Sequence, residues 1–199
     1  MGLFSWLRSR TPDTGDQRDH SLDARLGTGL WRQHRDRFGR AVDRLYTTAV
    51  QAQKEAPNTP SVLAVVELTH RLSELDQRAA GIAEYAHSRW PVEGLVLPAD
   101  VRRQAGDLPE LLSHAASKVS EAAQAAAHVR VTARQVKSTA HNEAGQPTDT
   151  EGTPADDFPA AEAAPAAADA SAAAAARFVD DAEHLIAQAH ARTLGKESP

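Results

Sequence analysis

Three long stretches of this 199-residue chain place apolar residues three or four positions apart, almost without a break. That spacing follows the 3.6-residue turn of an α-helix and puts the apolar side chains on one face of it. The first stretch carries Trp31, Phe38, Val42, Leu45, Ala49, Ala52 and Ala56, and the second carries Val65, Leu68, Leu72, Leu75, Ala79, Ile82 and Ala86. The third carries Leu112, Ala115, Val119, Ala122, Ala126, Val129, Ala133, Val136 and Ala140. The pattern predicts an all-α protein.

Proline and capping residues set the expected helix ends. Thr59 followed by Pro60 is typical of an N-cap and first helical position, and the link before it is so short that the first two helices must form an antiparallel hairpin. Pro91 disfavours helical geometry in the residue before it. Asp107 with Glu110 resembles a capping box. The predicted helices cover about 29–56, 60–89 and 108–140, and together form a bundle domain over 29–140.

The connection from residue 90 to 109 is too long for a plain turn. It carries Leu95, Val96, Leu97 and Val101, so we expect it to fold over one end of the bundle as a cap.

The C-terminal third is acidic and rich in alanine and proline. Residues 141–176 carry seven carboxylates, no lysine or arginine and four prolines. This composition predicts a disordered linker over 141–171. A further amphipathic helix over 172–194 follows, with Phe178, Ala182, Leu185 and Ala189 on one stripe and Val179 and Ile186 beside it. The expected fold is an elongated antiparallel three-helix core that this helix completes to a four-helix bundle.

Composition excludes several classes. The absence of cysteine rules out disulfides, thiolate nucleophiles and cysteine-ligated metals. No apolar run approaches the roughly 20 residues that span a bilayer, and the N-terminus does not resemble a secretory signal, so we expect a cytoplasmic protein. Alanine supplies 40 residues and arginine outnumbers lysine 18 to 4, which suggests a GC-rich bacterial genome.

Histidine and glutamate form two Glu-x-x-His pairs, Glu67 with His70 and Glu84 with His87, the spacing that di-iron bundles use. Both lie on one predicted helix, whereas that chemistry needs converging helices. His70 is also the only local candidate for phosphotransfer, without a supporting signature. Solvated surface histidines are favoured, also for His34, His114, His128, His184 and His190. We expect no metal and no cofactor.

Catalytic motifs are missing. There is no nucleophile elbow, phosphate loop or dinucleotide fingerprint. We therefore expect a protein that is not an enzyme and has no small-molecule substrate.

A row of arginines opens the first helix: Arg32, Arg35, Arg37, Arg40 and Arg44. These residues are candidates for contact with an anionic partner such as a phosphate group. The alternative is a solvated face whose arginines pair with Asp36, Asp43 or the acidic linker. Without a helix-turn-helix or a stacking platform, nucleic-acid binding is disfavoured.

The extreme N-terminus, residues 1–10, gathers large apolar residues before basic ones, and a polar spacer over 11–28 separates it from the bundle. The candidate contact residues are Leu3, Phe4, Trp6, Leu7, Arg8 and Arg10. Such a segment can lie in a membrane interface or dock in a partner's groove. It can equally fold back onto the bundle, and both interpretations stay open.

These patterns favour a non-enzymatic interaction or scaffold protein with an unknown protein partner. One version of this hypothesis is that the protein self-associates through its alanine-rich stripe. The alternative is a peripheral membrane adaptor that uses residues 2–8 as its anchor. A metal-binding bundle and a nucleic-acid-binding protein rank below both.

Overall fold

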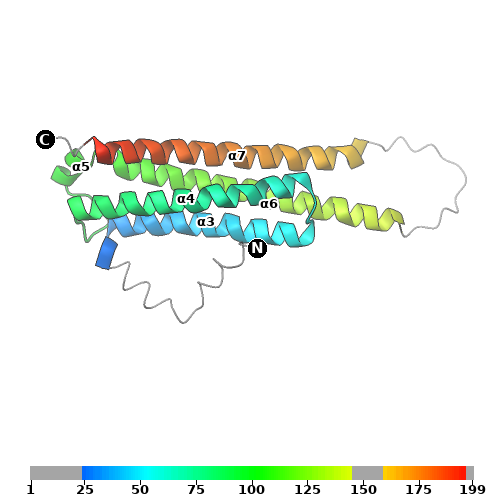
Figure 1. Cartoon of the computed structure of the whole chain (residues 1–199), viewed down its shortest axis with the longest axis horizontal. Coiled ribbons are helices and arrows are strands. Elements are labelled where there is room, and N and C mark those ends of the chain that lie inside the picture. The colour runs from blue at the N-terminus through cyan, green and yellow to red at the C-terminus, as the bar shows by residue number, and fades with distance from the viewer. Residues whose placement is uncertain (1–23, 145–158, 196–199) are drawn as a thin grey trace, which may run out of the picture.

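The computed structural model describes residues 24–144 and 159–195 and shows long helices packed side by side into an elongated bundle (Figure 1). The long helices are α3 (Leu30–Glu55), α4 (Pro60–Arg89), α6 (Leu108–Ala144) and α7 (Pro159–Leu194), and the short helix α5 (Ala99–Ala105) lies between α4 and α6. No strand occurs in these described ranges. The predicted all-α bundle is confirmed.

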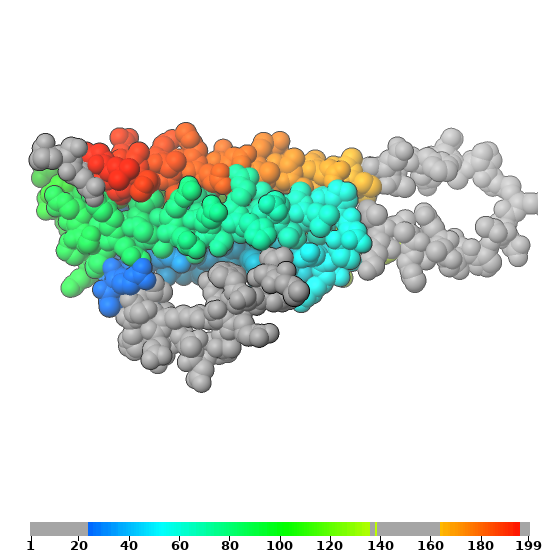
Figure 2. Space-filling view, viewed as in Figure 1, coloured from blue at the N-terminus to red at the C-terminus, as the bar shows by residue number. Residues whose placement is uncertain are grey.

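The four long helices form a ring in which each has two neighbours. Helix α3 packs against α4 and α6, and α7 packs against the same two helices from the other side. Successive long helices alternate in direction, and α4 and α7 lie side by side on the face that Figure 2 shows. Helices α4 and α6 follow each other in the chain but lie diagonally across the bundle, so their connection must cross its end.

The predicted stripes are the core. Every residue of the stripes expected on α3 and α4 is buried, and so are the α6 stripe residues from Leu112 to Ala133. The side chains of Val136 and Ala140 lie outside the described residues. Thr59 is the N-cap of α4 with Pro60 at its first position, as the sequence predicts.

Helix α7 corrects the prediction for the C-terminal region. A linker to residue 171 is wrong, because α7 begins at Pro159 and passes through Pro165. Pro159 lies at the first position, where a helix needs no backbone N–H. Pro165 removes one bond to the carbonyl four residues earlier. The alanines that follow favour the helix, and Ala168, Ala172 and Ala175 are buried, so packing offsets that loss.

The buried face of α7 is also rotated by one residue from the predicted stripe. Val179, Ala182, Ile186 and Ala189 are fully buried, whereas Phe178 and Leu185 are only partly buried at the edge. Two stripes one residue apart are both apolar here, so spacing alone did not distinguish them.

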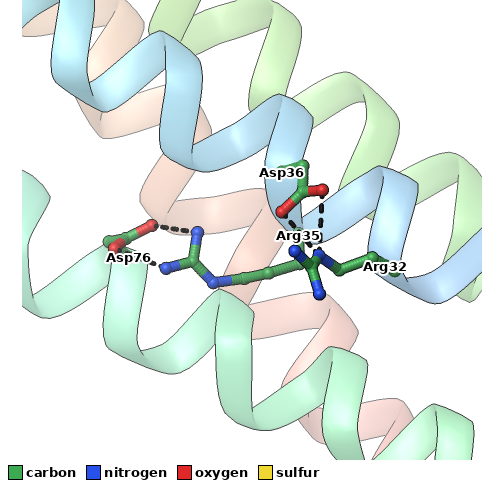
Figure 3. Close-up of polar contacts among 4 residues, drawn as sticks. All are labelled: Arg32, Arg35, Asp36 and Asp76. Atoms are coloured by element: carbon green, nitrogen blue, oxygen red, sulfur yellow. Dashed lines mark hydrogen bonds and ion pairs between the residues drawn. The ribbon is translucent and has the colours of Figure 1, made fainter. Parts of the chain in front are cut away.

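Each neighbouring pair of helices is joined by an ion pair at its edge. Arg35 on α3 pairs with Asp76 on α4 at 3.0 Å, as Figure 3 shows. Corresponding pairs join α4 to α7 through Arg71 and Glu183, α6 to α7 through Lys118 and Asp181, and α3 to α6 through Arg130 and Glu55. Arg35 and Asp76 are largely buried, whereas the other pairs are partly exposed and each stabilise the bundle only modestly.

We call the end of the bundle that residues 90–107 cross the capped end. Val92, Leu97 and Ala105 of this crossing segment are buried in the core cluster, which agrees with the expected cap. At the opposite end, α6 and α7 extend past the link between α3 and α4 (Figure 1).

Candidate interaction surface at the capped end

The loop that leaves α4 is held tightly against the start of α3. The Leu30 N–H donates to the Gly94 carbonyl at 3.0 Å, and the Trp31 indole N–H donates to the Trp90 carbonyl at 2.8 Å. Gly29 makes this approach feasible, because a Cβ there would lie 1.9 Å from the Val92 carbonyl oxygen. The loop therefore has a fixed conformation.

This fixed loop turns two of its apolar side chains outward. Val92 and Leu97 are buried, whereas Leu95 and Val96 are 59% and 79% exposed. The expectation that Leu95 and Val96 help to cover the core is wrong. Exposed apolar side chains on a rigid loop are typical of a surface that binds another molecule.

A shallow pocket of about 310 Å³ lies beside these side chains. Its apolar wall includes Leu30, Leu95, Val96 and Leu97, and its polar groups are His34, Arg102, Glu110 and Ser113. The sequence predicts His34 to be solvated, but it is half-buried, and its ring lies 6.3 Å from that of Trp31. Burial lowers the pKa of His34 below its ordinary value, the charge of Arg37 lowers it further, and Glu110 raises it. A neutral imidazole can donate or accept a hydrogen bond here.

Around the pocket, the exposed charges have both signs. Arg102 and Arg103 on α5 are exposed, as are Glu93, Asp100 and Glu110. An apolar centre with a mixed polar rim matches the usual build of a protein–protein interface.

The arginine row of α3 is not brought together as one surface. Arg32 donates to Asp36 within α3, and Arg35 reaches across to Asp76 on α4 (Figure 3). Arg37, Arg40 and Arg44 instead lie toward α6, where Arg37 contacts Ser113 and Ser117 and Arg44 contacts Ser120. Arg32 and Arg35 are thus engaged by carboxylates, and only the other three stay available to an anionic partner.

The two Glu-x-x-His pairs also do not converge. Glu67 and His70 are exposed, Glu84 pairs with Arg25, and His87 is half-buried against Gly27. The described part of the chain contains no group of three or more histidine, aspartate or glutamate side chains placed to hold a metal ion.

Two further candidates from the sequence have different outcomes. Residues 1–10, with the candidate contacts Leu3 to Arg10, lie outside the described residues. The alanines of the α6 stripe from Ala115 to Ala133 are buried against neighbouring helices of the same chain.

Comparison with protein-family models, curated proteins and solved structures finds no match. Within residues 24–144 and 159–195, no helix is long and apolar enough to cross a membrane.

Proposed function

We propose that this chain is a non-enzymatic interaction protein whose bundle presents Leu95 and Val96 to a protein partner. The observation that supports it is the exposure of these two side chains on a loop that backbone hydrogen bonds hold in place. A loop that is already ordered loses little conformational entropy when it binds. The adjacent pocket has room for an apolar side chain of the partner.

The two signs of charge around the loop favour a protein over an anionic membrane as the partner of this end. A lipid surface attracts clustered basic residues. Here Glu93 and Asp100 offset Arg102 and Arg103.

An affinity capture experiment on the full chain tests the proposal. A Leu95→Ser, Val96→Ser variant removes the apolar tip, and a Leu63→Ser variant, at a 48% exposed leucine of α4, is the matched control. We expect the intact chain and the control to recover the same partner and the double variant to lose it. Equal recovery by all three proteins would contradict the proposal.

A second candidate function is the peripheral membrane adaptor, which one observation favours. The start of the described chain contacts the capped end, where Gly29 meets Val92, so an anchor in residues 2–8 would be tethered to that end of the bundle. Liposome flotation of the intact chain and of one lacking residues 1–10 tests it. If the chain is a membrane adaptor, the intact chain floats with the liposomes and the truncated chain does not. If neither protein floats, the adaptor function is excluded.

A further inference from the structure

Three arginines on one face of α3 have no acidic partner within residues 24–144 and 159–195. Arg37, Arg40 and Arg44 are spaced by three and four residues, so they share a face, and all three are exposed. Among the described residues, Arg37 and Arg44 donate hydrogen bonds to serine hydroxyls, and Arg40 makes no side-chain hydrogen bond. The arginines at the other helix seams pair with carboxylates, as in Arg71 with Glu183 and Arg130 with Glu55, whereas the exposed Arg78, Arg89 and Arg103 have no ion pair among the described residues either. The charge of this triplet is therefore not neutralised by direct contact.

Serines of α6 hold two of these guanidinium groups in place. Arg37 donates to the Ser113 and Ser117 hydroxyl oxygens at 3.1 Å each, and Arg44 donates to Ser120 at 3.4 Å. The Ser117 and Ser120 hydroxyls donate to backbone carbonyls of α6, which leaves their lone pairs to accept from arginine. Each guanidinium group has five N–H donors, so most remain available to a ligand.

Arg44 lines a groove between α3 and α6, and Arg40 and Arg37 lie about one and two turns before it on the same helix face. The groove has a volume of about 440 Å³, and the rest of its lining is Asp43, Thr47, Thr48, Ser120, Ala123, Gln124 and Ala127. Hydroxyl, amide and guanidinium groups are the side chains that most often bind phosphate oxygens. The lining holds one arginine and one carboxylate, Arg44 and Asp43, so the excess positive charge comes from Arg37 and Arg40 beside the groove.

The shape and chemistry of the groove indicate the class of ligand. Arg37 and Arg44 are seven residues apart, which corresponds to about 10 Å along a helix. The lining holds no aromatic side chain on which a nucleic-acid base could stack, and no large apolar side chain that could enter a lipid layer. We propose that the face of α3 that carries Arg37, Arg40 and Arg44, at the edge of this groove, binds a linear oligophosphate. Ser113, which accepts from Arg37, also lines the pocket at the capped end, so the two surfaces adjoin, but this proposal does not depend on the proposed partner binding there.

Isothermal titration of the full chain with tripolyphosphate tests the proposal. We expect saturable binding that weakens as salt is raised, since the contact is electrostatic. The Arg37→Gln, Arg40→Gln, Arg44→Gln variant is expected to bind at least about tenfold more weakly, because charge-assisted hydrogen bonds are the strong ones. A Ser113→Ala, Ser117→Ala variant keeps every charge and is expected to lose a few-fold in affinity, because Arg37 is then less well positioned.

A charge-matched control separates a site from general attraction. The Arg78→Gln, Arg89→Gln, Arg103→Gln variant loses the same charge from exposed positions outside the groove and is expected to bind like the intact chain. Equal weakening in the two triple variants would overturn the proposal, as would no binding by the intact chain. Tighter binding of an oligothymidylate, or binding confined to vesicles of anionic lipid, would also overturn it, in favour of a nucleic acid or a membrane. Circular dichroism at 222 nm verifies that each variant is folded.

Discussion

The two ends of the bundle are built from side chains of different size. At the capped end, Trp31, Trp90, Leu97 and Leu108 are buried around an irregular crossing segment. At the other end, around the link between α3 and α4, the buried residues are small, among them Ala52, Ala56, Val62, Ala133 and Ala172. Straight helices can pack closely through alanine, whereas an irregular loop leaves gaps that only large side chains fill. The contrast indicates that the capped end is the part whose shape depends on specific residues.

The largest effect is expected from Trp31→Ala at the capped end. The indole is fully buried and donates to the Trp90 carbonyl, so the change leaves a cavity and removes this hydrogen bond. We expect a loss of about 3–5 kcal/mol in the free energy of unfolding, measured by urea denaturation. A loss below about 1 kcal/mol would mean that this end is no more specifically packed than the other.

Gly29→Ala tests whether the loop is fixed by close backbone approach. The new Cβ would meet the Val92 carbonyl, so the backbone must shift, at a cost of about 1–3 kcal/mol. Gly81→Ala is the matched control, since a Cβ there meets nothing within 4 Å. In an exposed helical position we expect it to stabilise the chain by about 0.5–1 kcal/mol. Thermal unfolding of both variants measures the two effects, and the same sign in both would contradict this account of the loop.

Ala172→Gly examines the alanine-packed part of α7. It removes one buried methyl group and favours the unfolded chain, so we expect a loss of about 1 kcal/mol. Urea denaturation compares it directly with Trp31→Ala. If Ala172→Gly lowered the free energy of unfolding as much as Trp31→Ala does, the two ends of the bundle would not differ in how specifically they are packed.

The smallest expected effect is on the pH dependence of stability, and it tests whether His34 is buried in the pocket at the capped end. Its pKa is lowered in the folded chain, chiefly by burial, so the unfolded chain binds the proton more readily. The contribution of His34 is therefore nil well above pH 6.5, and stability is lost as the pH falls through 6.5 towards the folded pKa. We expect the intact chain to lose more stability between pH 7.5 and 5.5 than a His34→Leu variant. Parallel pH profiles of the two melting temperatures would contradict this.

Much of the fold follows from spacing. The stripes of α3, α4 and α6 are confirmed because each has one apolar face with polar residues opposite. The composition of residues 141–171, by contrast, predicted the wrong start for α7. The helical preference of alanine and burial against α6 outweigh the effect of Pro165, and composition alone does not describe that tertiary packing.

The candidate surfaces were less predictable. Spacing could not show that Arg35 reaches Asp76 while Arg37 and Arg44 meet serines of α6, because the neighbour of each helix face is set by the fold. The exposure of Leu95 and Val96 had no sequence signal either. A loop without a repeat gives no rule for which side chains face inward.

In-cell photo-crosslinking tests the central claim most directly, namely that the capped end binds a protein partner. A photoreactive amino acid is placed at position 96 in one protein and at position 63 in another, since both side chains are exposed but only Val96 lies on the fixed loop. We expect a discrete crosslinked species from position 96 and none from position 63. The absence of a crosslink at 96, or the same species from both positions, would contradict the claim.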